Sequence, residues 1–262
     1  MTGSRWVTLG AVLVAGAIAV AACGGSSKKN DKTPGASTPA SGSTAAAGKT
    51  AGTTQTSGGG STDPELRALG KKFTQSTFNA TYKVSGADAA QFSDGVLKLV
   101  KDGDKKFRME VNAKQDGVDT TIIFIESDAV QAFCLKDAGA LGALLGIEAG
   151  KGVCFPSSPS DKNNPVGSLR DSLTDFENAN VTLLEKSTKK VAGQDGKCYK
   201  TKDNDTSEIA TTCFNADGVI LYTKTEGDSG SEIEAQDVSG KVSADDFKLP
   251  YEIKELPGSL GG

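Results

Sequence analysis

The sequence TFNATYKV, residues 77–84, alternates polar and apolar side chains at every position. A period of two puts every second side chain on the same face of an extended strand. The apolar side chains of this stretch are Phe78, Ala80, Tyr82 and Val84. We therefore predict a half-buried β-strand here, with its apolar face turned toward a core.

The same alternation recurs along the chain, between clusters of residues that favour turns. Further strands are predicted over 96–101, 107–111, 118–125, 129–135, 181–192, 197–202, 208–214, 218–225 and 231–239. Helix signals are fewer: Asp63 and Pro64 supply an N-cap and a first-turn proline for a short helix, and a second helix is predicted from Pro165 onward. The predicted fold class is therefore mainly β (α+β), a large antiparallel sheet that curls to protect its apolar face.

The stretch Ala138–Gly150 combines glycines with apolar side chains, among them Leu141, Leu144 and Leu145. Its glycines argue against a rigid helix. One interpretation is a flexible lid or mouth over a hydrophobic cavity. The other is a short helix that simply packs onto the sheet.

An export signal is predicted at the N-terminus. Arg5 precedes an apolar run over 6–20, which is too short to span a bilayer comfortably. The run ends in VAAC, residues 20–23, and two glycines follow, a pattern typical of a bacterial lipobox. In a lipoprotein the thiol of Cys23 is acylated and the chain is cut just before it. The alternative is an ordinary secretory signal with a chance cysteine.

Composition sets the predicted boundaries. Residues 1–22 are the signal peptide, and 23–63 are the lipidated cysteine and a tether rich in Gly, Ser, Thr and Ala, which has no large apolar residue to bury. Residues 64–257 form a single β domain, long enough to bury a sizeable core, and 258–262 form a tail. We expect the protein at the cell membrane, lipid-anchored on the extracytoplasmic face.

The charge of the chain argues against nucleic acid as a partner. From residue 64 onward there are 24 Lys and Arg against 31 Asp and Glu, whereas nucleic-acid binders need a basic face to neutralise phosphates. No second apolar run approaches the eighteen or more residues of a membrane span. The membrane is therefore reached through the N-terminal lipid anchor, and the sequence identifies no protein partner.

Four cysteines besides Cys23 indicate two disulfides in an exported chain. Three pairings are possible, and one is favoured. An Asp-Asn-Asp turn lies near the midpoint between Cys198 and Cys213, so a hairpin sets these two opposite each other, and Cys134 and Cys154 flank the glycine-rich stretch in a similar way. Cys134–Cys154 and Cys198–Cys213 are the predicted bridges, each stabilising by about 3 kcal/mol. A zinc site is disfavoured because the spacings differ from C-x2-C and histidine is absent.

The absence of histidine excludes Ser/His/Asp and Cys/His catalysis. The run 227–230, Gly-Asp-Ser-Gly, matches the nucleophile motif of trypsin-like proteases, but it lies between two strand signals and is interpreted as a turn. No phosphate-binding glycine loop occurs between a strand and a helix. We therefore predict a protein that is not an enzyme and uses no metal and no cofactor.

These features together resemble the LolA/LolB-like superfamily of lipoproteins, in particular the LppX/LprG type of actinobacterial lipoprotein. The resemblance is carried by the lipobox, the tether, the run VAGQDGKCY at 191–199 and the closing VSADDFKLP at 242–250. It implies a curved antiparallel half-barrel with a few helices over its concave face and a hydrophobic cavity between them. In characterised members this cavity carries the acyl chains of lipoproteins, glycolipids or related lipids across an aqueous layer.

The resemblance further implies that this chain binds or transfers a hydrophobic ligand, a lipid or glycolipid, in such a cavity. The inward-facing candidates are Phe78, Tyr82, Phe107, Met109, Ile122 and Phe124, with Leu141, Leu144 and Leu145 at the mouth. The two cysteine pairs depart from the simplest members, which favours a smaller or differently gated cavity. The alternative hypothesis is a non-catalytic envelope interaction or sensor domain whose barrel is filled by its own side chains.

Overall fold

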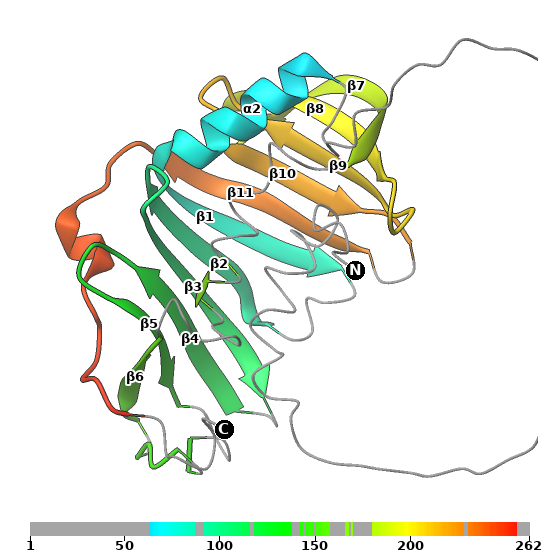
Figure 1. The fold of residues 1–262 in the computed structure, drawn as a ribbon. Coiled ribbons are helices and arrows are strands. Elements are labelled where there is room, and N and C mark those ends of the chain that lie inside the picture. The colour runs from blue at the N-terminus through cyan, green and yellow to red at the C-terminus, as the bar shows by residue number, and fades with distance from the viewer. Residues whose placement is uncertain are drawn as a thin grey trace, which may run out of the picture.

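The strands of the computed structural model belong to one antiparallel sheet in the part of the chain that the structure describes (Figure 1). That part comprises residues 63–86, 92–115, 118–137, 142–143, 145–148, 150–157, 166–167, 169, 180–227 and 230–255. The strands are β1 (Thr77–Gly86), β2 (Phe92–Asp102), β3 (Lys106–Gln115), β4 (Val118–Glu126), β5 (Gln131–Lys136), β6 (Gly152–Pro156), β7 (Val181–Val191), β8 (Gln194–Asp203), β9 (Ile209–Phe214), β10 (Ile220–Thr225) and β11 (Ser231–Ser239).

The order of the strands shows two meanders joined side by side. Across the sheet it runs β6-β5-β4-β3-β2-β1-β11-β10-β9-β8-β7. Strands β1 to β6 follow one another, as do β7 to β11, and the two sets meet where β1 pairs with β11. Strands β6 and β7 are therefore the two edges of the sheet.

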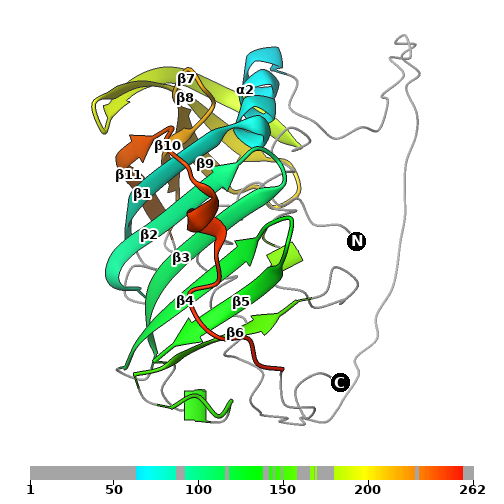
Figure 2. The same ribbon diagram turned by 90° about the vertical axis from the view of Figure 1, so that its left-hand side faces the viewer.

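This architecture confirms the predicted fold class, because it is mainly β, antiparallel, curved and open (Figures 1 and 2). Strand β6 is an addition that the alternation did not predict, since its central residues 153–155 are apolar at every position. Of the second predicted helix, residues 166–167 and 169 are helical, and the rest lies outside the described residues.

Helix α2 (Pro64–Gln75) lies across one end of strands β8 to β11 (Figure 1). The Asp63 carboxylate caps it by accepting a hydrogen bond from the Leu66 backbone N–H at 2.9 Å, and proline occupies its first turn. The buried face of the helix consists of Leu66, Leu69, Gly70 and Phe73. The Phe73 ring contacts that of Phe78 on β1, with 5.9 Å between their centroids. The helix therefore packs on the face of the sheet that carries Phe78.

We call this the inner face and the opposite one the outer face. On the outer face, four buried residues of β4, β5 and β6 form a small cluster: Ile123, Ile125, Cys134 and Cys154. Leu249 and Tyr251 cover this cluster. Strands β4 and β5 are consequently buried on both faces, which explains why residues 122–125 and 132–135 are buried at every position.

The segment 240–255, which we call the C-terminal strap, runs over the outer side of the sheet toward β6 (Figure 2). It contains the short 3-10 helix η3 (Ala244–Phe247), which contacts β3. The Cys154 backbone N–H donates to the Glu252 carbonyl, and the Lys254 N–H donates to the Cys154 carbonyl, both at 2.9 Å. The strap thus covers the β6 edge, which would otherwise offer unpaired backbone groups to another chain.

Both disulfides form between the cysteines that the sequence pattern predicts to pair. Cys134–Cys154 links β5 to β6 and Cys198–Cys213 links β8 to β9, each between directly opposed residues whose Cα atoms are 3.9 Å apart. Asp203 shapes the turn between β8 and β9, because its carboxylate accepts hydrogen bonds from the backbone N–H groups of the second and third residues after it, at 2.8 and 2.7 Å.

Candidate functional site

The inner face of β1 to β6 carries two unbroken cross-strand rows of apolar side chains. Directly paired residues of an antiparallel ladder share a face, so the register defines the rows. The first row runs Tyr82, Leu97, Val111, Ile122, Leu135 and Val153. The second row runs Ala80, Leu99, Met109, Phe124, Phe133 and Phe155. We call these twelve residues the apolar rows, and none of them is more than 9% exposed.

A third row limits this apolar surface near the C-terminal end of α2. It runs Phe78, Lys101, Phe107, Glu126 and Gln131. Lys101 is only 3% exposed, and its ammonium donates to the backbone carbonyls of Thr74 and Gly103. Burial lowers the pKa of Lys101 to about 8. This buried cation joins the last turn of α2 to the β2–β3 hairpin.

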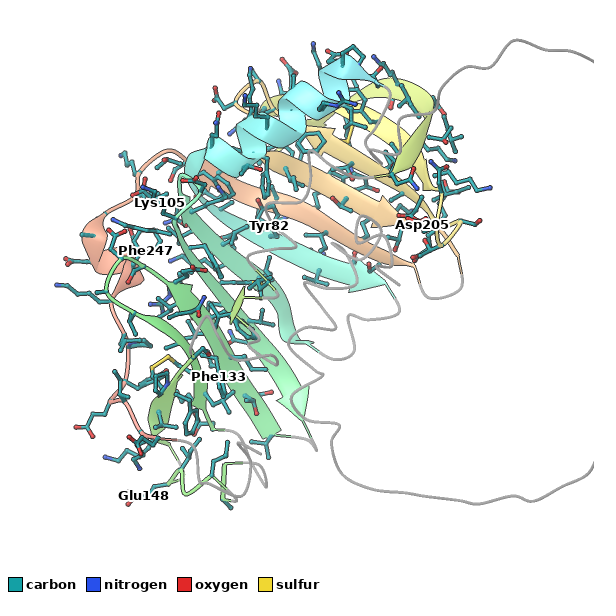
Figure 3. The ribbon with its side chains drawn as sticks, viewed as in Figure 1. Tyr82, Lys105, Phe133, Glu148, Asp205 and Phe247 are labelled. Carbon is teal, nitrogen blue, oxygen red and sulfur yellow. A yellow bond between two sulfur atoms is a disulfide. The ribbon has the colours of Figure 1, made fainter. Side chains whose placement is uncertain are left out.

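Tyr82 lies where the two meanders meet, as Figure 3 shows. Its hydroxyl donates to the backbone carbonyl of Ile220 on β10 at 3.1 Å, although β11 lies between the two strands. Burial raises the pKa of Tyr82 well above its usual value. A side chain of β1 that reaches β10 shows how strongly the sheet curves around its inner face.

Ion pairs fasten the first turn of α2 to β7 and β8. The Lys186 ammonium lies 2.9 Å from the Asp63 carboxylate and 3.1 Å from that of Glu65, and the Lys197 ammonium lies 2.7 Å from Glu65. Hydrogen bonds from Lys197 and Lys186 lower the pKa of Glu65 to about 2. The two carboxylates and two ammonium groups form an ion-pair cluster without net charge.

An open groove of about 400 Å³ lies beside the C-terminal end of α2. Its walls come from the end of α2, the start of β1, the turn 215–219 and residues 238–240. Asn215 is already satisfied there, because its side chain donates to Gln194 at 2.7 Å and accepts from the backbone N–H groups of Asp217 and Val219. The sequence did not indicate this groove, since its walls are far apart along the chain.

The structure brings together seven of the nine predicted cavity residues. Phe78, Tyr82, Phe107, Met109, Ile122, Phe124 and Leu145 all belong to one cluster of buried side chains. Leu141, Leu144 and Cys23 lie outside the described residues. The inner-face residues of β5 and β6 cannot be predicted from alternation, because residues 132–135 and 153–155 are apolar at every position, so the pattern does not show which of them face inward.

Among the described residues, no three His, Cys, Asp or Glu side chains are grouped so as to hold a metal ion. No helix in that same part of the chain combines the length and the hydrophobicity that crossing a membrane requires.

No protein-family model matches the chain, and no curated protein matches it. Among solved structures, it is similar to LprF from Mycobacterium bovis, with 9% identity over 72% of this chain and 98% of LprF, at a TM-score of 0.41. For the Mycobacterium tuberculosis lipoprotein LppX the identity is 12% over 70% of this chain and 100% of LppX, at a TM-score of 0.36.

A third similar structure is MucB in complex with MucA(peri), with 12% identity over 70% of this chain and a TM-score of 0.32. The present chain spans only 58% of that MucB chain. The lipoprotein group that the sequence resembles takes part of its name from LppX. These likenesses concern the fold alone.

Proposed function

We propose that this protein is a membrane-anchored, extracytoplasmic lipoprotein that binds or transfers a hydrophobic ligand, whose acyl chains lie against the apolar rows. The observation that carries the proposal is the continuity of these rows across six neighbouring strands. With strands about 4.8 Å apart, each row extends for about 24 Å. One leaflet of a bilayer holds acyl chains of about 15 Å, so a row is long enough for such a chain.

The energy of such binding needs no catalytic group. Transfer of a chain of about sixteen carbons from water to an apolar surface gains about 0.8 kcal/mol per CH₂, or more than about 10 kcal/mol in all. Lipidation of Cys23 and a tether over 23–63 would keep the domain close to the membrane from which such a ligand comes.

The test uses the full chain with Cys23→Ser, which has no acyl group of its own to compete for the inner face. Lipid is extracted from the purified protein and identified by mass spectrometry, and binding of palmitate and of the apolar dye diphenylhexatriene is measured. We expect a co-purified lipid and binding of both probes. A protein that carries no lipid and binds neither probe would contradict the proposal. The same variant should leave the membrane fraction if Cys23 is the anchor.

A second candidate function is an interaction or sensor domain with a filled core. The observation that favours it is the low exposure of all seven described cavity residues, which is at most 9%. Ala80→Leu separates the two candidates, because Ala80 is fully buried on the inner face between larger residues. In a filled core the larger side chain destabilises by about 1–3 kcal/mol. In a ligand site it displaces the ligand and leaves the free energy of unfolding of the ligand-free protein nearly unchanged.

A further inference from the structure

The groove beside the C-terminal end of α2 is separate from the apolar rows, since none of the twelve residues of these rows lines it. Phe78 of the third row does line the groove, but it is only 1% exposed and its ring packs against that of Phe73. Lys101, in the same row, is buried too. The third row therefore lies between the groove and the apolar rows, so a ligand in the groove leaves these rows free.

Amide and hydroxyl side chains make up half of the residues that line the groove: Gln75, Gln194, Asn215, Ser76, Thr77 and Ser239. An amide offers two donor hydrogens and a carbonyl acceptor, and a hydroxyl both donates and accepts. Gln194 accepts from the Asn215 amide at 2.7 Å through its Oε1, a bond that uses neither of its own amide hydrogens. The groove therefore offers uncharged donors and acceptors together.

The charge of the groove does not favour an ionic ligand. Among the described residues that line it, Lys72 supplies one positive charge and Asp217 one negative charge. The Lys72 ammonium also donates to the backbone carbonyl of Ala216, the neighbour of Asp217 in the sequence, at 2.9 Å. Because a site binds an ion best when its potential is complementary to that ion, a groove with balanced charges suits an uncharged ligand.

The walls of the groove are preformed. The side-chain oxygen of Asn215 accepts from the backbone N–H groups of Asp217 and Val219, at 3.0 and 2.8 Å, which fixes the β9–β10 turn. Val219 and Val238 add apolar surface to the lining. The volume of about 400 Å³ lies in the range of about 300–1,000 Å³ that is usual for small-molecule sites. A ligand therefore gains its contacts without first having to order the turn.

An extended peptide fits this groove less well than a small polar molecule. Peptides commonly bind by adding a strand to a free sheet edge. The edges of this sheet are β6 and β7, and no residue of either strand lines the groove. The donors and acceptors come instead from side chains of α2, of the β9–β10 turn and of the ends of β8 and β11. Such an arrangement suits a molecule that carries hydroxyl groups on several sides.

We propose that this groove binds an uncharged saccharide of one or two rings. Each sugar hydroxyl both donates and accepts, which matches the amide and hydroxyl side chains of the groove, and the C–H groups of a ring can contact Val219 and Val238. The proposal goes beyond the hydrophobic ligand of the inner face, because it gives the domain a second site for a different class of ligand. The groove and the apolar rows have no residue in common, so each site can be tested without the other.

The test titrates the full chain with Cys23→Ser in a calorimeter with three neutral disaccharides: maltose, cellobiose and chitobiose. Digalacturonate is the anionic comparison, and acetyl-trialanine amide is the neutral peptide. We expect at least one neutral disaccharide to bind more tightly than digalacturonate and the peptide. Gln75→Ala/Ser239→Ala removes an amide and a hydroxyl from the groove. It should weaken disaccharide binding about tenfold, the loss expected for two neutral hydrogen bonds.

The matched control is Gln236→Ala/Ser187→Ala, which removes an exposed amide and an exposed hydroxyl outside the groove. It should bind the disaccharide as the parent does, and thermal unfolding checks that both variants are folded. Failure of all three disaccharides to bind, tighter binding of digalacturonate or the peptide, or an equal loss in the control would overturn the proposal. Diphenylhexatriene should bind the groove variant as it binds the parent. A parent that binds a disaccharide but no dye and no lipid would refute the proposed function and support the groove.

Discussion

Gly218, in the turn between β9 and β10, lies against Lys72 and Phe73 of helix α2. Its φ is +82°, and a Cβ at this position would lie 2.5 Å from the Lys72 Cβ and 2.8 Å from the Phe73 nitrogen. Gly218→Ala should therefore lower the free energy of unfolding by about 2–3 kcal/mol, since backbone strain and a clash add together. The measurement is urea unfolding.

Gly193→Ala is the control for this substitution. Gly193 has a similar φ of +75° but has open space where its Cβ would be. It should lose only about 1 kcal/mol through backbone strain. Equal losses at the two glycines would show that α2 does not press on the β9–β10 turn.

Lys101 is a residue whose burial makes stability depend on pH. Its pKa falls from 10.5 to about 8 in the folded protein. Between these values the unfolded chain binds more protons than the folded one, so the free energy of unfolding should rise with pH from about 8 toward 10. Urea unfolding at pH 7.5, 8.5 and 9.5 measures this rise, and Lys101→Met should flatten it. The control Lys105→Met, at an exposed lysine, should leave the rise in the free energy of unfolding unchanged. A slope that persists in Lys101→Met would refute the assignment.

At the scale of the element, the C-terminal strap is a cover for one edge and one disulfide. The Tyr251 ring lies directly over Gly152, where a Cβ would come within 2.6 Å of it, and Tyr251 also packs on the cluster that contains Cys134 and Cys154. Tyr251→Ala should therefore let dithiothreitol reach the Cys134–Cys154 bond faster. Alkylation followed by mass spectrometry should find little change at Cys198–Cys213, which the strap does not cover, and equal acceleration of both bonds would argue for general destabilisation instead.

The elements differ in how far sequence alone predicts them. Alternation located β1 and β3 because only their inner faces are apolar, and the Asp63 cap located α2 because capping is local. For residues 132–135 the pattern does not show which side chains face inward, because the strap also buries the outer side of β5. That contact comes from residues more than 100 positions later in the sequence. The pairing of β1 with β11 is equally non-local.

At the scale of the whole molecule, the curved sheet combines two surfaces with different chemistry. One meander contributes the apolar rows, and the other contributes the ion pairs that hold the first turn of α2. Tyr82 joins them, since it belongs to the first apolar row and donates its hydroxyl to Ile220 of the second meander. Strand pairing within each meander is local, but the composite face exists only once β1 and β11 have paired.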